Sequence, residues 1–163
     1  MQIGRADMAI AESLEEYLAS RHIAYEVFTH PKTSTAMQTV HKANIPADRM
    51  VKCVVLEDDA GYVMAVVPAS HRVDLGKIRT AMNRRLGLAM ENEFSAMLDD
   101  CTVGAVPPVG QAYGMATIIA DELSDQPDIY MEGGDHQALL HLTGGQFNAL
   151  MTGAVHGDIS HRV

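Results

Sequence analysis

The sequence predicts a single mixed α/β domain, and three observations support this prediction. The chain of 163 residues is long enough for one hydrophobic core but short for two. Apolar residues make up 47% of it and charged residues 20%, a balance typical of globular proteins. Segments with helical periodicity alternate with segments of strand periodicity, and no repeat, linker or low-complexity stretch separates them.

The first third of the chain predicts helix, strand and helix in turn. In residues 6–21, apolar side chains recur on one helical face and glutamates lie mostly on the other. Residues 23–28 alternate as a strand does, before a His-Pro step ends the pattern. A short helix follows over residues 35–44, with Ser34 or Thr35 as its N-cap.

The middle of the chain predicts a β-hairpin and a basic helix. Two β-rich runs, RMVKCVVLEDD and GYVMAVVPAS, are joined by a turn at residues 58–61. Pro68 closes the second strand, because proline cannot donate a hydrogen bond to a sheet. Asp74 is a natural N-cap for a helix over residues 75–84.

The last part of the chain predicts shorter elements. We expect a short helix in ENEFSAMLDD and a loop in the Gly- and Pro-rich CTVGAVPPVGQAYG. Strand patterns occur in MATIIADEL, DIYMEGG and QALLHL, and a short helix pattern occurs in GGQFNALM. Residues 152–163 have no clear periodicity, and we expect them to form a loosely held tail.

Charge is distributed unevenly along the chain. The formal net charge of −9 argues against broad affinity for a phosphate backbone. Residues 1–85, however, hold 11 of the 12 Lys and Arg residues, whereas residues 86–163 hold one Arg against 11 acids. The cations of residues 71–85 are Arg72, Lys77, Arg79, Arg84 and Arg85. This segment is either a solvated helix face or a local landing surface for a polyanion.

Other classes of protein fit the sequence poorly. No apolar run approaches the roughly 18 residues that cross a bilayer, and acidic residues stand where a signal peptide needs an apolar region. We therefore expect a cytoplasmic protein without a membrane partner. The two cysteines, Cys53 and Cys101, are too few for a disulfide scaffold and lack CxxC spacing, so we expect reduced packing residues.

Lys52 is the most unusual residue, because it interrupts the apolar run MVKCVVL. In a strand it would share a face with Met50 and Val54, and both faces of the run are apolar, which predicts an inner strand. An unpaired buried ammonium costs several kcal/mol or loses its proton. Four interpretations of Lys52 therefore stay open. Its ammonium snorkels to the surface, it is a gatekeeper charge on an edge strand, it forms a structural ion pair, or it faces a ligand.

Two glycine-containing loops are further candidates for a site. In GAVPPVG, residues 104–110, prolines restrict the backbone while glycines permit unusual conformations. Such a loop can present fixed N–H groups to a carbonyl or phosphate oxygen, or it is a tight structural turn. In EGGDH, residues 132–136, two glycines allow close backbone approach, and Asp135 either orients His136 or belongs to a surface turn.

Taken in order, the segments THPKTSTA, MVKCVVL, VMAVVPASHRVDLGKI, CTVGAVPPVG and DIYMEGGDH resemble the YbaK/prolyl-tRNA-synthetase-associated domain family. The resemblance covers about residues 8–150, which we take as the core of one domain spanning residues 1–163. It implies a mixed β-sheet, curved into an open barrel and surrounded by helices. It also implies an aminoacyl-tRNA deacylase that removes amino acids wrongly attached to tRNA, acting in trans because no synthetase domain is attached.

The same resemblance assigns roles to individual residues. Lys52 corresponds to the lysine most closely tied to activity. The substrate-binding residues would be His30, Pro31, Thr35, Ala36, Gly104, Pro107, Gly133, Gly134, Asp135 and His136. Family members differ in the segment that reads GGDH here, so the amino acid removed stays open. The implied partners are a mischarged aminoacyl-tRNA and an aminoacyl-tRNA synthetase in trans, with no metal or cofactor, and a monomer or a weak homodimer.

This chemistry needs no strong nucleophile. An aminoacyl ester on a ribose hydroxyl is already activated, so positioning and oxyanion stabilisation matter more than a catalytic triad. We hypothesise that Lys52 binds the terminal nucleotide or the ester, and that amides around Gly104 stabilise the oxyanion. Water would be the nucleophile, assisted by the neighbouring ribose hydroxyl.

Three alternatives remain open from the residues themselves. A metallohydrolase would use His136 and His141, or the tail residues His156, Asp158 and His161, but no HExxH motif is present. Cysteine catalysis would use Cys53, which we expect on the strand face opposite Lys52. A binding module for tRNA or a small ligand would keep the fold and the pocket without turnover.

Overall fold

The computed structural model describes residues 10–90, 94–101 and 105–163. Within these ranges an eight-stranded mixed sheet has the order β1-β8-β7-β2-β3-β6-β9, and β5 pairs with β2 outside this path. Its strands are β1 (Glu26–Thr29), β2 (Met50–Asp58), β3 (Gly61–Pro68), β5 (Gly87–Leu88), β6 (Ala116–Ala120), β7 (Asp128–Glu132), β8 (Ala138–Thr143) and β9 (Val155–Gly157). A second sheet pairs β4 (His71–Val73) with β10 (Ser160–Arg162).

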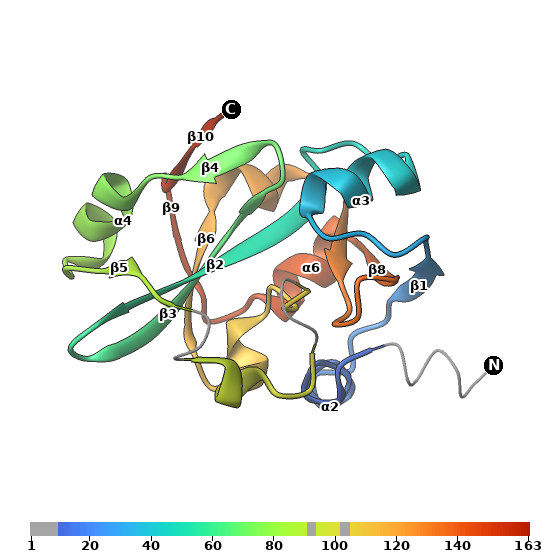
Figure 1. Cartoon of the computed structure of the whole chain (residues 1–163), viewed down its shortest axis with the longest axis horizontal. Coiled ribbons are helices and arrows are strands. Elements are labelled where there is room, and N and C mark those ends of the chain that lie inside the picture. The colour runs from blue at the N-terminus through green and yellow to red at the C-terminus, as the bar shows by residue number, and fades with distance from the viewer. Residues whose placement is uncertain (1–9, 91–93, 102–104) are drawn as a thin grey trace.

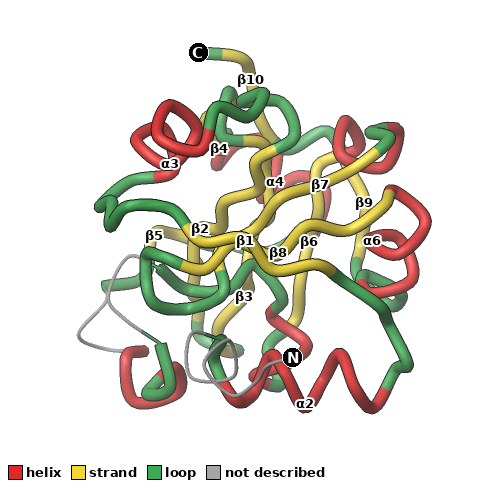
Figure 2. Tube along the Cα trace, turned by 90° about the vertical axis from the view of Figure 1, so that its right-hand side faces the viewer, coloured by secondary structure: helices red, strands yellow, loops and turns green. Residues whose placement is uncertain are grey.

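Helices cover both faces of this sheet. The α-helices are α2 (Glu12–Ser20), α3 (Ala36–Ala43), α4 (Leu75–Met82) and α6 (Gly144–Leu150), and the 3-10 helices are η1 (Ser95–Leu98), η2 (Gly110–Tyr113) and η3 (Asp121–Asp125). Figure 1 shows α3 and α4 toward opposite ends of the molecule, with β2 and β3 between them. Figure 2 shows the strands curving across the middle and α2 below them. The predicted mixed α/β fold with a curved mixed sheet is confirmed.

The hairpin at the centre of the sheet forms where the sequence predicts it. β2 and β3 pair antiparallel from Val51 opposite Pro68 to Asp58 opposite Gly61. β3 ends at Pro68, as expected for a residue without an amide hydrogen. Because β7 flanks β2 on its other side, β2 is an inner strand of the sheet.

Side chains that alternate along β2 enter different parts of the core. One face of the sheet packs in a large apolar cluster with Leu14 of α2 and Phe147 of α6. The other face carries two separate clusters, one with Val40 of α3 and one with Ile78 of α4. Burial in each cluster removes apolar surface from water, which stabilises the fold by about 25 cal/mol per Å². The division of the second face into two clusters is the feature that frames the candidate site.

Capping residues define where the helices begin. The side chain of Thr35 accepts a hydrogen bond from the amide of Gln38 at the start of α3. The side chain of Asp74 accepts one from the amide of Lys77 at the start of α4. Both residues act as the sequence predicts, because their short oxygen-bearing side chains satisfy amides that have no partner inside the helix.

The prediction of a loosely held tail at residues 152–163 is wrong. β9 pairs parallel with β6, and β10 pairs antiparallel with β4. Ile159, between them, is fully buried in the cluster that contains Ile78. Strands of three residues are too short for a periodicity signal, and the tail's partners are distant in sequence. The two-residue β5 and three-residue β4 were missed for the same reason.

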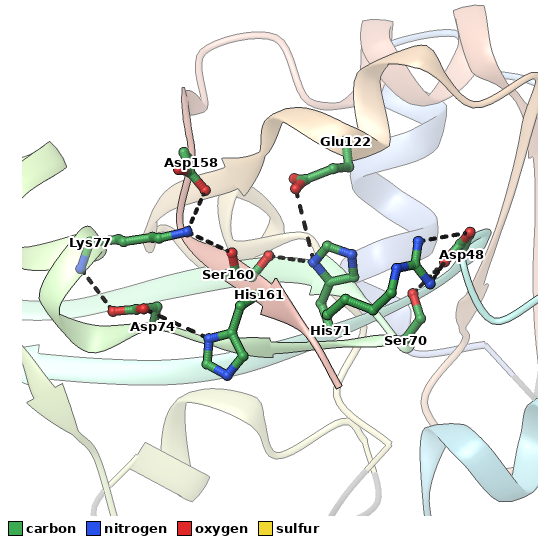
Figure 3. A network of polar contacts seen from close by, with 10 residues as sticks. Asp48, Ser70, His71, Asp74, Lys77, Glu122, Asp158, Ser160 and His161 are labelled. Atoms are coloured by element: carbon green, nitrogen blue, oxygen red, sulfur yellow. Dashed lines mark hydrogen bonds and ion pairs between the residues drawn. The ribbon is translucent and has the colours of Figure 1, made fainter.

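Polar contacts also attach the tail, as Figure 3 shows. The ring Nδ1 of His71 lies 2.8 Å from the hydroxyl of Ser160. The ammonium of Lys77 donates to the carboxylate of Asp158 at 3.0 Å and to the carbonyl of Ser160 at 3.2 Å. These contacts place the last residues in the fold, joined to β4 and α4.

Ile159→Ala tests the role of the tail. Because the side chain is fully buried, we expect the free energy of unfolding to fall by about 2–4 kcal/mol, the usual loss for such a truncation. Val163→Ala, at a terminal residue that is 75% exposed, is the control and should change it by less than about 0.5 kcal/mol. Urea denaturation measures both, and equal small effects would show that the tail does not contribute to the core.

Candidate functional site

A cavity of about 250 Å³ opens beside β2. β7 pairs with β2 at Met50 and Val51, and β5 pairs with it at Leu56 and Glu57. The cavity lies beside the stretch between these two pairings. Its lining residues are Ala36, Met50, Val51, Lys52, Cys53, Val55, Phe94, Val106 and Glu132. Among the described residues, the walls are mostly apolar and include one cationic and one acidic side chain.

Lys52 lines this cavity from the gap between two apolar clusters. Its strand neighbour Met50 belongs to the α3 cluster, while Val54 packs against the α4 cluster. Lys52 is half-buried and makes no ion pair within residues 10–90, 94–101 and 105–163. The structure therefore contradicts one of these interpretations, a structural ion pair among these residues. β2 is an inner strand of the sheet, but Lys52 lies between its pairings with β7 and β5, beside the cavity.

Burial lowers the pKa of Lys52 from its ordinary value, and the nearby positive charge of Arg72 lowers it further. Both effects act on the charged form, because desolvation and a like charge each disfavour an ammonium. Arg72 lies on β4, exposed to solvent. An anion entering the cavity would relieve both effects, so the position is suited to a negatively charged or strongly polar ligand group.

Glu132, at the end of β7, is the second ionisable residue of the cavity. It is only 8% exposed, and its Oε2 lies 3.2 Å from the hydroxyl of Thr39 on α3. Its Oε1 is shielded from solvent and has no hydrogen-bond partner among the described residues. Burial raises the pKa of Glu132, and the nearby His30 and His136 partly oppose this effect. The sequence indicated no role for this residue, although its segment EGGDH was singled out.

His30 lies close enough to Glu132 to influence its charge. Its Nδ1 lies 2.8 Å from the carbonyl of Pro31, so Nδ1 carries a proton. Its Nε2 is buried and lacks a hydrogen-bond partner in the described ranges. His30 and Pro31 line a neighbouring pocket with Lys42 and Tyr130, not the cavity of Lys52.

The residues of the first predicted binding segment therefore do not share one pocket. Ala36 lines the cavity that contains Lys52. Thr35 caps α3 and so fixes the position of Ala36 at the start of that helix. His30 and Pro31 line the second pocket. The sequence grouped these residues in one binding segment, and the structure places them at two separate pockets.

The loop after Glu132 is a tight, buried turn. Gly133 accepts a hydrogen bond from the amide of Ala11 at 2.7 Å, and Gly134 has a φ of +129°. The side chain of Asp135 accepts the amides of Gln137 at 2.9 Å and Ala138 at 2.8 Å. None of the four predicted residues from Gly133 to His136 is among the described lining of the cavity.

His136 fixes this turn against the segment after His30. Its φ is +65°, in the left-handed region, and its carbonyl accepts the amide of Thr33 at 3.4 Å. The side chain is 7% exposed. The turn thus links the end of β7, where Glu132 lines the cavity, to the segment that contains Thr33.

The Gly- and Pro-rich loop reaches the cavity through Val106. Gly104 lies outside the described residues. Pro107 is buried, and its carbonyl accepts the amide of Val109 at 2.8 Å. The carbonyl of Val106 lies 3.6 Å from the thiol of Cys53. Cys53 therefore lines the same cavity as Lys52, although the sequence placed it on the opposite strand face; the cavity extends past the strand edge and meets both faces.

Three of the five cations in the basic segment are engaged within the fold. Arg84 donates to both carboxylate oxygens of Asp58 at 2.6 and 2.7 Å, which lowers the pKa of that carboxyl to about 2. Arg79 donates to the carbonyl of Leu86 at 2.7 Å, and Lys77 bonds to the tail. Arg72 and Arg85 are exposed. The segment is thus partly structural, which the sequence could not show.

Metal ligands do not gather in the part of the chain that the structure describes. No group of three or more His, Cys, Asp and Glu side chains there could hold a metal ion. His141, one of the candidates, lies between the carboxylates of Glu26 and Asp128 at 2.9 and 2.8 Å. Those carboxylates raise the pKa of His141 against the opposing effect of burial.

The sequence also matches a known family. The model of the aminoacyl-tRNA editing domain matches residues 30–150, which is most of the chain and includes Lys52 and Glu132. The chain therefore belongs to the aminoacyl-tRNA editing domain family, which confirms the resemblance found in its motifs. It has no significant match among curated protein sequences.

Solved structures share the fold over almost the whole chain. The crystal structure of "a putative trans-editing enzyme for prolyl tRNA synthetase" is 25% identical, with a TM-score of 0.80, and the match covers 98% of this chain and 99% of that one. The crystal structure of hypothetical protein APE2540 is 24% identical, with a TM-score of 0.81, and covers 92% and 100%. No helix in the described ranges is long and apolar enough to cross a membrane.

Glu132→Gln tests whether the buried carboxyl is held at a cost. The pKa of Glu132 is raised above its ordinary value of 4.5, so the folded state binds the proton more tightly than the unfolded state. The contribution of this group to stability is therefore complete below pH 4.5 and is lost as the pH rises through the raised pKa. We therefore expect the free energy of unfolding of the variant to increase relative to that of the wild type as the pH rises, by an amount on the order of 1 kcal/mol.

Urea denaturation between pH 4 and pH 8 measures this difference. Glu16→Gln, which changes an exposed carboxyl on α2, controls for the loss of one negative charge. A difference between Glu132→Gln and the wild type that stays constant with pH, or shrinks as the pH rises, would contradict the assignment.

Proposed function

We propose that this protein is a freestanding aminoacyl-tRNA deacylase, which hydrolyses the ester of mischarged tRNA in trans. The observation that carries the proposal is Lys52, a half-buried cation without an ion-pair partner in the described ranges, at a cavity of about 250 Å³. Membership of the editing domain family supports it, because editing acts on an aminoacyl ester. The solved trans-editing relative, similar over nearly its whole length, further supports action in trans.

The reaction adds water to the ester carbonyl. The water oxygen bonds to the carbonyl carbon, and its proton passes to the neighbouring ribose hydroxyl, which relays it toward the leaving oxygen. Collapse of the tetrahedral intermediate breaks the bond to the ribose oxygen, giving a free amino acid and a tRNA with both terminal hydroxyls. Lys52 holds the terminal nucleotide or the ester by a charge-assisted contact. The Gly- and Pro-rich loop, which meets the cavity at Val106, supplies amides to the oxyanion.

Other parts of the chain support tRNA binding to different degrees. Arg72 is exposed and lies near enough to lower the pKa of Lys52, which makes it the basic residue best placed to meet the terminal phosphates. Arg85 is exposed beside α4, whereas Arg79 and Arg84 are held by fold contacts. Binding through Arg72 would follow the usual salt dependence of phosphate contacts.

We propose that residues 1–163 act as one editing domain, as a monomer or weak homodimer in the cytoplasm, where charged tRNA is available. An aminoacyl-tRNA synthetase that makes the charging error is the natural second partner. A non-catalytic module on the same fold would bind the same ligands without releasing amino acid, so turnover separates the two functions.

Lys52→Ala tests the proposal. Against a panel of mischarged tRNAs, we expect the wild type to release at least one amino acid and the variant to lose about 100-fold or more of that rate, as when a stabilising contact is removed from a transition state. The melting temperature should hold or rise, since Lys52 has no ion-pair partner among the described residues to leave behind.

Lys42→Ala is the matched control, because Lys42 is exposed and lines the neighbouring pocket. It should keep the wild-type rate. Wild-type turnover by Lys52→Ala would remove the lysine from the mechanism. A wild-type protein that binds charged tRNA but hydrolyses no member of the panel would favour the binding module.

A further inference from the structure

We propose that Glu132 is a specificity-determining residue whose side chain binds the α-ammonium group of the aminoacyl ligand. The inference rests on the proposed function for the identity of the ligand, but its geometry is independent of turnover. The carboxyl of Glu132 and the ammonium of Lys52 would bind opposite ends of the same bound group.

The first observation is that an acidic and a basic side chain share one cavity without forming an ion pair with each other. Val51 of β2 lies opposite Met131 of β7, so Lys52 and Glu132 are the next residues along two parallel strands. Both line the cavity, yet no ion pair joins them. Buried charges usually pair with each other or with a ligand. Because Lys52 and Glu132 do not pair with each other, both can bind a ligand in the cavity.

The second observation is an unsatisfied atom on a buried side chain. Glu132 is 8% exposed, and its Oε1 has no hydrogen-bond partner among the described residues. Among the described residues, Oε2 has one hydrogen-bond partner, the hydroxyl of Thr39, whose single proton is also within reach of the carbonyl of Thr35 at 3.2 Å. Buried polar groups are satisfied in the great majority of cases, so an exception beside a cavity marks a position for a donor.

The charges around Glu132 are defined by three elements. His30 approaches from the segment before α3, and Asp135 and His136 belong to the turn after β7. Thr39 of α3 donates the one side-chain hydrogen bond that Glu132 accepts among the described residues. Burial raises the pKa of Glu132, because desolvation disfavours the carboxylate. An arriving ammonium favours the carboxylate and so lowers that pKa, and any proton bound to Glu132 is then released to bulk solvent.

The chemistry of an aminoacyl ester matches this arrangement. Its α-ammonium stands next to the carbonyl carbon, and the ribose phosphate lies on the other side of the ester. Such a group is cationic at one end and anionic at the other, as Glu132 and Lys52 require. The remaining lining includes Val51, Val55 and Phe94, which offer apolar surface to the amino-acid side chain. A blocked, N-acylated amino acid lacks the cation and would leave Glu132 without its donor.

Isothermal titration calorimetry with a stable analogue tests the inference. The probes are 3′-alanylamino-3′-deoxyadenosine 5′-phosphate, whose amide resists hydrolysis, and its N-acetyl form. Alanine is chosen because it is the smallest chiral amino acid. We expect the wild type to bind the free amine about 10-fold or more tightly than the acetyl form, as a charge-assisted hydrogen bond provides. Glu132→Gln should bring the ratio near one by weakening only the free amine.

Proton release gives a second readout that a merely structural role would not move. Titrations in buffers of different ionisation enthalpy should show proton release when the wild type binds the free amine, and less release for Glu132→Gln. Lys42→Ala, at an exposed residue of the neighbouring pocket, is the control and should keep the wild-type ratio and release.

The outcomes separate this inference from the proposed function. An unchanged ratio in Glu132→Gln, an equal weakening of both probes, or no binding of either probe to the wild type would overturn the inference. A wild type that hydrolyses no charged tRNA but prefers the free amine through Glu132 would remove the proposed function and keep the inference. Hydrolysis without any dependence on Glu132 would do the opposite.

Discussion

The candidate site depends on a gap in the strand pairing along one edge of β2. β7 pairs with β2 for two residues and β5 for two more, and the cavity opens beside the stretch between them. A cation at Lys52 would be costly inside a continuous sheet covered by helices. Here it reaches a cavity at the point where the α3 and α4 clusters are separate. Glu132, at the end of β7, lines the same cavity.

Support for these two side chains comes from buried turns and caps. Thr35 caps α3, which brings Ala36 to the wall and Thr39 to the carboxyl of Glu132. The turn after β7 adopts positive φ at Gly134 and His136 and holds the segment near Thr33. These contacts are expensive to form around an unsatisfied carboxyl, and we interpret them as preorganisation for a ligand.

Local signals in the sequence were enough for much of the fold. The hairpin follows from two β-rich runs and a short turn, and the caps Thr35 and Asp74 follow from side-chain chemistry. Lys52 stood out because a lone charge in an apolar run demands an explanation. Glu132 gave no such signal, since its burial depends on residues far away in the chain. The tail around Ile159 was misjudged because its partners are also distant.

The titration of Lys52 itself tests the central claim, that its ammonium binds an anionic ligand group. Nuclear magnetic resonance of the lysine side chains, with Lys52→Arg for assignment, would follow the pKa of Lys52 with and without the trinucleotide CCA. We expect a pKa below the ordinary value in the free protein, because of burial and Arg72, and a rise on binding as phosphate compensates both. A pKa that stays the same at saturating trinucleotide would contradict the account.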